Sequence, residues 1–135
     1  MTATSRPLQL SVLAERFAIA RLAPDAAIPR WATDGAFFSV TRTSDELSII
    51  TEEPRLPSGL ASQTGWRALK VHGPFALSEI GVVASLAAPL ARAGISLFVV
   101  STFDTDYLLV ASENLAAAVS ALERAGHAVC RSESE

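Results

Sequence analysis

Two short segments of the sequence carry groups that together could hold a small zwitterion. They span Ser78 to Val82 and Ser101 to Asp106. A helix opening at Gly81 would present unpaired backbone N–H groups and a favourable dipole to a carboxylate, and glycine would let a ligand approach the backbone closely. Glu79 and Asp104 could accept hydrogen bonds from an ammonium group, and neighbouring hydroxyls could add contacts. The candidate ligand-binding residues are Ser78, Glu79, Ile80, Gly81, Val82, Ser101, Thr102, Phe103 and Asp104.

Several of these residues also have a purely structural interpretation. Gly81 could be only a packing glycine, and Glu79 could simply complement the helix dipole. Asp106 is a further acid in the second segment. Aspartates that flank a tight turn favour local hydrogen bonds, and for Asp106 that interpretation is the better one. Asp104 and Asp106 alone are too few ligands for a metal site. We therefore expect no metal and no cofactor.

Catalysis is not expected from this sequence. His72 lies in a loop close to the first segment, and a histidine near Asp or Ser invites comparison with a catalytic triad. However, the sequence contains no nucleophile elbow, no His-Glu-x-x-His and no phosphate-binding loop. His127 is expected in the last strand, and Cys130 is expected to be a small buried hydrophobic residue. A small enzyme that uses His72 is kept as a third hypothesis.

The composition excludes several classes of protein. The chain has 135 residues, of which 50% are hydrophobic, and 11 basic residues stand against 14 acidic ones. These values exclude a disordered chain and a strongly basic nucleic-acid binder. The apolar stretch from Ile80 to Phe103 is long enough to cross a membrane, but Pro89, Arg92 and Gly94 favour a helix followed by a strand. With no secretory signal expected at the N-terminus, we predict a cytoplasmic protein without a membrane or nucleic-acid partner.

The second half of the chain predicts the order strand, helix, strand, strand, helix, strand. Val82, Leu86 and Leu90 lie on one face of the first helix, and Gly94 is expected at its left-handed C-terminal position. The second helix is expected to begin at an N-cap, Ser112. This order is the α+β, ferredoxin-like βαββαβ fold, with helices on one face of an antiparallel sheet. The expected strands are 66–71, 95–101, 106–111 and 127–130, and the expected helices are 82–93 and 112–125.

The first half is shorter and lacks a good final helix. Strands are expected at 8–13 and 17–22, turned at Glu15-Arg16, although a short helix at 17–22 is an alternative. A hairpin is expected from 37–42 and 46–50. This hairpin aligns with residues 97–101 and 105–110, sixty residues later. The sequence thus favours two tandem repeats, a degenerate one in residues 1–64 and a complete one in residues 65–135. A linker rich in Pro, Gly and Ser follows residue 53 or so and extends to about residue 65.

The strands of the second half are apolar on both faces. Ile95 to Val100 and Tyr107 to Val110 alternate little between apolar and polar residues. Helices can cover only one face of such a sheet, and an exposed apolar area of that size is rare on monomers. The first half could cover or extend the sheet. A second chain could also cover it, so we expect a homodimer.

The run from Gly81 to Ile95 resembles the first helix and second strand of ACT domains, which are small amino-acid-sensing regulatory modules. Ser101 to Val110 resembles a signature of the tandem-ACT group that includes the cytosolic arginine sensors of the CASTOR type, and aspartate-kinase regulatory domains are more distant relatives. Residues 37–43 and 46–50, preceded by Ile28-Pro29, resemble the first repeat of the same group. The arginine sensors carry twice as many repeats in one chain, so here a dimer would have to supply the other two.

The resemblance implies a ligand at a repeat or dimer interface beside the loop around Gly81. We therefore predict a non-catalytic regulatory protein that binds a small molecule, with an amino acid as the expected ligand and an unidentified protein as a possible target. The alternative is a ligandless ACT-fold module that only pairs chains or contacts another protein.

Overall fold

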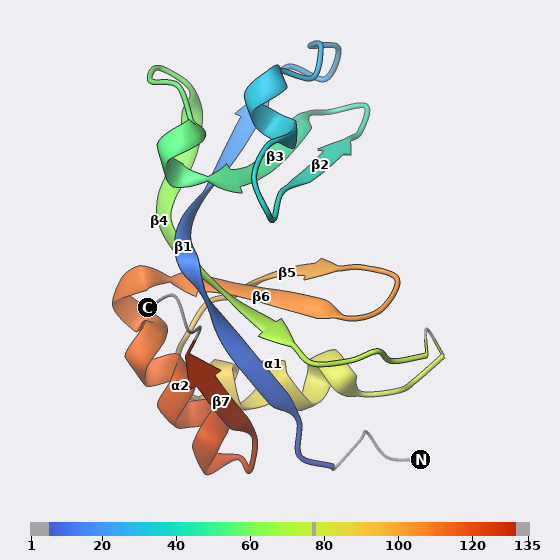
Figure 1. The fold of residues 1–135 in the computed structure, drawn as a ribbon, viewed down its shortest axis with the longest axis vertical. Coiled ribbons are helices and arrows are strands. Elements are labelled where there is room, and N and C mark those ends of the chain that lie inside the picture. The colour runs from blue at the N-terminus through green and yellow to red at the C-terminus, as the bar shows by residue number, and fades with distance from the viewer. Residues whose placement is uncertain (1–5, 77, 132–135) are drawn as a thin grey trace. The chain divides into compact units, whose positions relative to one another are not determined.

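The computed structural model describes residues 6–76 and 78–131, and the chain forms two compact units (Figure 1). Unit 1 contains the described residues up to Ala14 and from Arg67 onward, and unit 2 contains Glu15–Trp66. None of the helices in the described part of the chain has the length and apolarity needed to cross a bilayer. The strands are β1 (Gln9–Leu22), β2 (Ser39–Arg42), β3 (Leu47–Glu52), β4 (Ala61–Val71), β5 (Phe98–Ser101), β6 (Asp106–Ala111) and β7 (Ala128–Arg131), and the helices are α1 (Val82–Arg92) and α2 (Leu115–Arg124).

Unit 1 has the predicted α+β fold. From β4 onward its elements follow the order strand, helix, strand, strand, helix, strand, and its strands lie in the order β7-β1-β4-β6-β5. β5 and β6 are antiparallel, whereas β7 pairs with β1 in parallel. Apolar residues of α1 and α2 share one core with the strands. Its fully buried side chains include Leu10, Val12, Leu69, Leu86, Leu90, Leu108 and Leu122.

The first part of β1, up to Ala14, belongs to unit 1, which the sequence did not indicate. Gln9 to Val12 pair with Ala128 to Arg131, and Leu10 and Val12 lie in the unit 1 core. The contacts therefore divide the chain differently from the predicted boundary after residue 64. The tandem-repeat interpretation of the two halves stays a prediction.

Two expectations for the first half of the chain were wrong. β1 runs without a turn at Glu15-Arg16, because neither residue is a glycine or proline that would interrupt an extended chain. β4 begins at Ala61, inside the predicted linker, since the polar residues Ser62 to Thr64 are compatible with an exposed strand.

Two details of the second half also differ from the sequence prediction. Asn114, rather than Ser112, occupies the N-cap position of α2, because a short 3-10 turn over Ser112–Asn114 precedes the helix. Strand β5 begins only at Phe98. The end of α1 is as predicted: Gly94 has a φ of 75°, and the Ile95 N–H donates to the Leu90 carbonyl.

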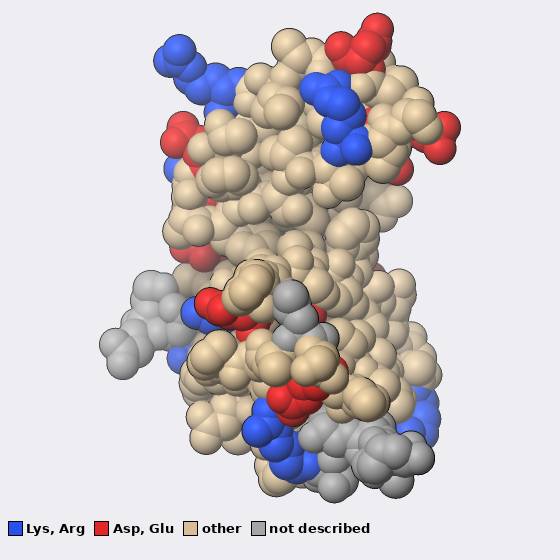
Figure 2. Space-filling model, turned by 90° about the vertical axis from the view of Figure 1, so that its right-hand side faces the viewer, with Lys and Arg blue, Asp and Glu red and all other residues tan. Residues whose placement is uncertain are grey.

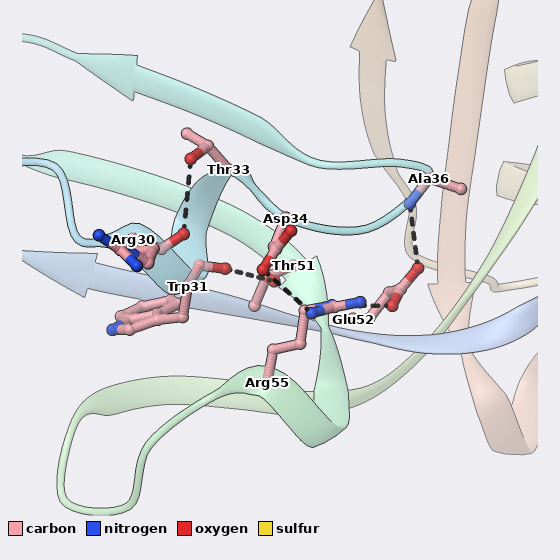
Figure 3. A network of polar contacts seen from close by, with 8 residues as sticks. All are labelled: Arg30, Trp31, Thr33, Asp34, Ala36, Thr51, Glu52 and Arg55. Atoms are coloured by element: carbon pink, nitrogen blue, oxygen red, sulfur yellow. Dashed lines mark hydrogen bonds and ion pairs between the residues drawn. The ribbon is translucent and has the colours of Figure 1, made fainter.

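Unit 2 contains the strand order β2-β3-β1. The predicted hairpin joins β2 to β3, and its turn is closed by a hydrogen bond from the Thr43 N–H to the Glu46 carbonyl. A small core forms around Ala32, Leu47 and Ile49. The loop before β2 is held by polar contacts (Figure 3), in which the Glu52 carboxylate binds both the Arg55 guanidinium and the Ala36 N–H.

Candidate functional site

A cavity of about 380 Å³ lies in unit 1, where the loop after β4, the first turn of α1 and the β5–β6 turn meet. Its volume is within the range of about 300–1,000 Å³ that is typical of small-molecule sites. Of the nine predicted binding residues, seven line this cavity, and Ser78 and Ile80 do not. The lining residues are Phe75, Ala76, Glu79, Gly81, Val82, Val83, Ala84, Ser101, Thr102, Phe103, Asp104, Thr105 and Asp106.

The cavity contains the start of α1, where backbone N–H groups have no intrahelical partner. Gly81 is the N-cap residue and makes no side-chain capping hydrogen bond. Its φ is 87°, a left-handed conformation that glycine adopts at no steric cost. The first backbone hydrogen bond of the helix runs from the Ser85 N–H to the Gly81 carbonyl. The N–H groups of Val82 to Ala84 therefore come before the first intrahelical hydrogen bond. Gly81 thus sets the direction in which the chain enters α1, which is a role beyond packing.

The β5–β6 turn forms the opposite wall and is held in one conformation by its own hydroxyl groups. The Thr102 N–H donates to the Thr105 carbonyl at 2.8 Å, and the Thr105 N–H donates to the Thr102 hydroxyl at 3.2 Å. The Thr105 hydroxyl is buried and donates to the Val71 carbonyl at the end of β4, at 2.6 Å. The turn therefore belongs to the rigid sheet rather than to a free loop.

A backbone hydrogen bond joins the two walls. The Phe75 N–H donates to the Asp104 carbonyl at 2.8 Å. This approach requires glycine at position 73, because a Cβ atom there would lie 2.9 Å from the Asp104 carbonyl oxygen. Sequence reasoning missed both Phe75 and Gly73, since their partner is about thirty residues away in the chain.

The three acids of the cavity have different partners. The Asp106 carboxylate accepts a hydrogen bond from the Ser101 hydroxyl at 2.5 Å, which confirms the local role predicted for this residue. The Glu79 carboxylate pairs with Arg6, at 3.0 Å. The Asp104 carboxylate is exposed and makes no hydrogen bond or ion pair with any described residue. Asp104 is thus the acid best placed to accept a ligand ammonium group.

Two large apolar side chains lie at or beside the cavity and face solvent. Phe103, which lines the cavity, is 79% exposed, and Ile80, just before the helix, is 66% exposed. Figure 2 shows the face of unit 1 that carries the β5–β6 turn, with acidic side chains gathered on it and basic atoms directly beside some of them. Apolar and acidic groups therefore occur together around the cavity.

A separate cluster lies on β1, β7 and the loop after β4, outside the cavity lining. The Ser11 hydroxyl lies 2.5 Å from His72 Nε2 and 3.2 Å from Cys130 Sγ. Cys130 is exposed, so its predicted burial was wrong: its side chain lies on the opposite side of the last strand from Val129, which is partly buried and packs against the core. Among the described residues, no group of three or more His, Cys, Asp or Glu side chains is placed to hold a metal ion.

His127 has a structural role just before β7. Its Nδ1 accepts the Leu8 N–H at 3.1 Å, and its Nε2 lies 3.2 Å from the Ser85 carbonyl, which assigns the proton to Nε2. The side chain is nearly buried. His127 thereby connects the N-terminal segment to α1.

Comparison with known families and proteins supports this description. A family profile described as an ACT domain matches residues 61–124, and a second profile, for an N-terminal domain, matches residues 15–59. The cytosolic arginine sensor for mTORC1 subunit 1 of Bos taurus is 34% identical over an alignment of 97 residues that covers 66% of this chain and 30% of that protein. The chain therefore spans about a third of the length of the arginine sensors it matches.

Two solved structures extend the comparison. Protein Atu0741 from Agrobacterium tumefaciens is 44% identical and superimposes with a TM-score of 0.90. The superposition covers 95% of this chain and 96% of that one. The regulatory subunit of aspartate kinase from Thermus thermophilus is 12% identical, with a TM-score of 0.62 over 87% of this chain and 97% of that one. The second likeness concerns the fold alone.

Proposed function

We propose, because this chain belongs to the ACT-domain family, that it is a non-catalytic regulatory protein that binds a free amino acid in the cavity of unit 1. The family assignment confirms the resemblance predicted from the run around Gly81 and from the Ser101–Val110 segment. A relative named as an arginine sensor supports a regulatory role. The word cytosolic in the relative's name supports the expected cytoplasmic location.

One observation carries the proposal: the uncapped start of α1 and the unpartnered Asp104 carboxylate line the same cavity. The N–H groups of Val82 to Ala84 would bind the ligand carboxylate, where the helix dipole also favours negative charge. The Asp104 carboxylate would accept hydrogen bonds from the ligand ammonium group. The two charges of an amino acid would thus each meet a complementary group on opposite walls.

The other cavity residues would shape the site rather than hold the charged groups. The hydroxyls of Ser101 and Thr102 are already engaged by Asp106 and Thr105. Phe103 is exposed enough to contact the ligand side chain or to cover it. Ser78 and Ile80 lie beside the cavity without lining it, and their part in binding stays a prediction.

A thermal-shift screen of the twenty amino acids tests the proposal. A ligand present well above its dissociation constant should raise the unfolding midpoint of the wild-type protein. Asp104→Asn keeps the shape of the side chain and removes its charge, so we expect affinity to fall roughly 10- to 100-fold. Asp25→Asn, at an exposed acid of unit 2, is the matched control and should bind like the wild type. If no amino acid shifts the midpoint at saturating concentration, the proposal fails.

The alternative function is a ligandless module that pairs chains or contacts another protein. Exposed aromatic side chains favour it, since Phe98 is 38% exposed and Phe103 is 79% exposed. In that case no amino acid would bind, and Phe98→Ser would change the oligomeric state measured by sedimentation. A homodimer and a separate protein target remain expectations under either function.

A further inference from the structure

Two residues that line the cavity already contact a cation that the chain itself supplies, although that cation is not part of the lining. The Arg6 guanidinium lies 3.0 Å from the Glu79 carboxylate, and its Cζ lies 5.0 Å from the centre of the Phe75 ring. Glu79 and Phe75 both line the cavity. A carboxylate together with an aromatic face is a combination that binds guanidinium and ammonium groups. The contacts of Arg6 therefore identify what this corner of the cavity recognises.

We propose that Glu79 and Phe75 form a cation subsite of the amino-acid site, and that Arg6, by filling it, makes the site select against amino acids with cationic side chains. This inference rests on the proposed function, because it concerns the selectivity of the same cavity. A ligand with a neutral side chain can bind while Arg6 stays in place. A ligand with a cationic side chain must displace Arg6 before it reaches the carboxylate and the ring.

Arg6 is held close to its subsite by the fold. Leu8, two residues further on, is buried in the unit 1 core. Its N–H donates to His127, and its carbonyl accepts the Ala128 N–H at 2.9 Å. A group tethered so near its binding partners has a high effective concentration, so it competes well with a free ligand.

The same contacts are weak enough to be displaced. The Arg6 side chain is 53% exposed and that of Glu79 is 28% exposed, so solvent screens the ion pair. An exposed ion pair and an exposed cation–π contact together correspond to roughly 3- to 30-fold in affinity. Arg6 therefore imposes a preference on the site without closing it.

Calorimetry on the full chain tests this selectivity. The quantity to compare is the affinity for L-arginine divided by the affinity for whichever neutral amino acid stabilises the wild-type protein most. Arg6→Gln should raise this ratio roughly 3- to 30-fold, because the competing cation is gone and the Glu79 carboxylate is left available. Arg124→Gln, at an exposed arginine in the last turn of α2, is the matched control and should leave the ratio unchanged.

A second substitution checks that the gain depends on the subsite. In Arg6→Gln/Glu79→Gln the rise in the affinity ratio for L-arginine should disappear, because the subsite has lost its negative charge. Arg6→Ala should behave like Arg6→Gln, and the unfolding midpoint of each variant without ligand shows whether it is folded.

The outcomes separate this inference from the function on which it rests. If a neutral amino acid binds but Arg6→Gln leaves the ratio as it is in the wild type, the selectivity role of Arg6 is refuted and the amino-acid site stands. If the ratio rises equally in Arg124→Gln, a general change of charge explains it and the subsite is likewise refuted. If none of these proteins binds any amino acid, the proposed function is overturned together with this inference.

Discussion

Replacing Gly81 with alanine separates backbone strain at the entry of α1 from loss of the ligand site. Gly81 has a φ of 87°, where an L-residue costs about 1–2 kcal/mol relative to ordinary backbone. Alanine also restricts the unfolded chain, which stabilises the protein by about 0.4–1 kcal/mol. We expect Gly81→Ala to lower the free energy of unfolding by about 1 kcal/mol, measured by urea denaturation.

Gly94→Ala provides a matched control at the other end of the same helix. Gly94 has a φ of 75°, and a Cβ atom there would meet no other atom within 4 Å. Its substitution therefore carries a similar backbone cost without a steric clash. The residue does not line the cavity. The two variants should lose similar amounts of stability.

Ligand affinity should distinguish the two variants. In Gly81→Ala the first turn of α1 must rotate to relieve the strain, which moves the N–H groups that face the cavity. Loss of one hydrogen bond to a charged carboxylate corresponds to about a tenfold lower affinity. Gly94→Ala should bind the ligand as the wild type does. Equal affinity in both variants would refute the assignment of the helix start as the carboxylate site.

Two further substitutions test the framework around the cavity. Gly73→Ala would place a Cβ atom 2.9 Å from the Asp104 carbonyl oxygen, so it should break the hydrogen bond from the Phe75 N–H, speed exchange of that amide proton and weaken ligand binding. An unchanged exchange rate of the Phe75 amide proton would contradict the loss of this hydrogen bond. His127→Phe keeps a ring of similar size but leaves the Leu8 N–H without its acceptor, so urea denaturation should show a loss of about 1–3 kcal/mol; a loss below 0.5 kcal/mol would mean that another acceptor replaces the imidazole.

The elements that could be predicted from the sequence are those defined by local pattern. Val82, Leu86 and Leu90 repeat at helical spacing, and all three are buried. Gly94 ends α1 because only glycine adopts its left-handed conformation without cost. The strand-turn-strand pattern around Asp104 likewise predicted the turn that forms one wall of the cavity. Each of these signals lies within about a dozen residues of the chain.

The features that escaped prediction depend on residues that are distant in sequence. The pairing of β1 with β7 joins positions more than a hundred residues apart, and no local pattern specifies a parallel partner. The Thr105 hydroxyl reaches the Val71 carbonyl only because β6 lies beside β4. The ion-pair partner of Glu79 could not be inferred either. The residues next to Glu79 in the sequence suggested only that its carboxylate interacts with the helix dipole.

Arg6 illustrates how the fold itself determines the chemistry of the cavity. Its position follows from the burial of Leu8, and Leu8 is held by His127 and Ala128 at the far end of the chain. The cation at Glu79 therefore depends on the packing of the last strand, although neither residue is near that strand in sequence. Because the same short segment supplies a core residue and a charged group, a change in the core at Leu8 should alter ligand selectivity as well as stability. Stability and selectivity should thus be coupled through two positions of the N-terminal segment that are only two residues apart.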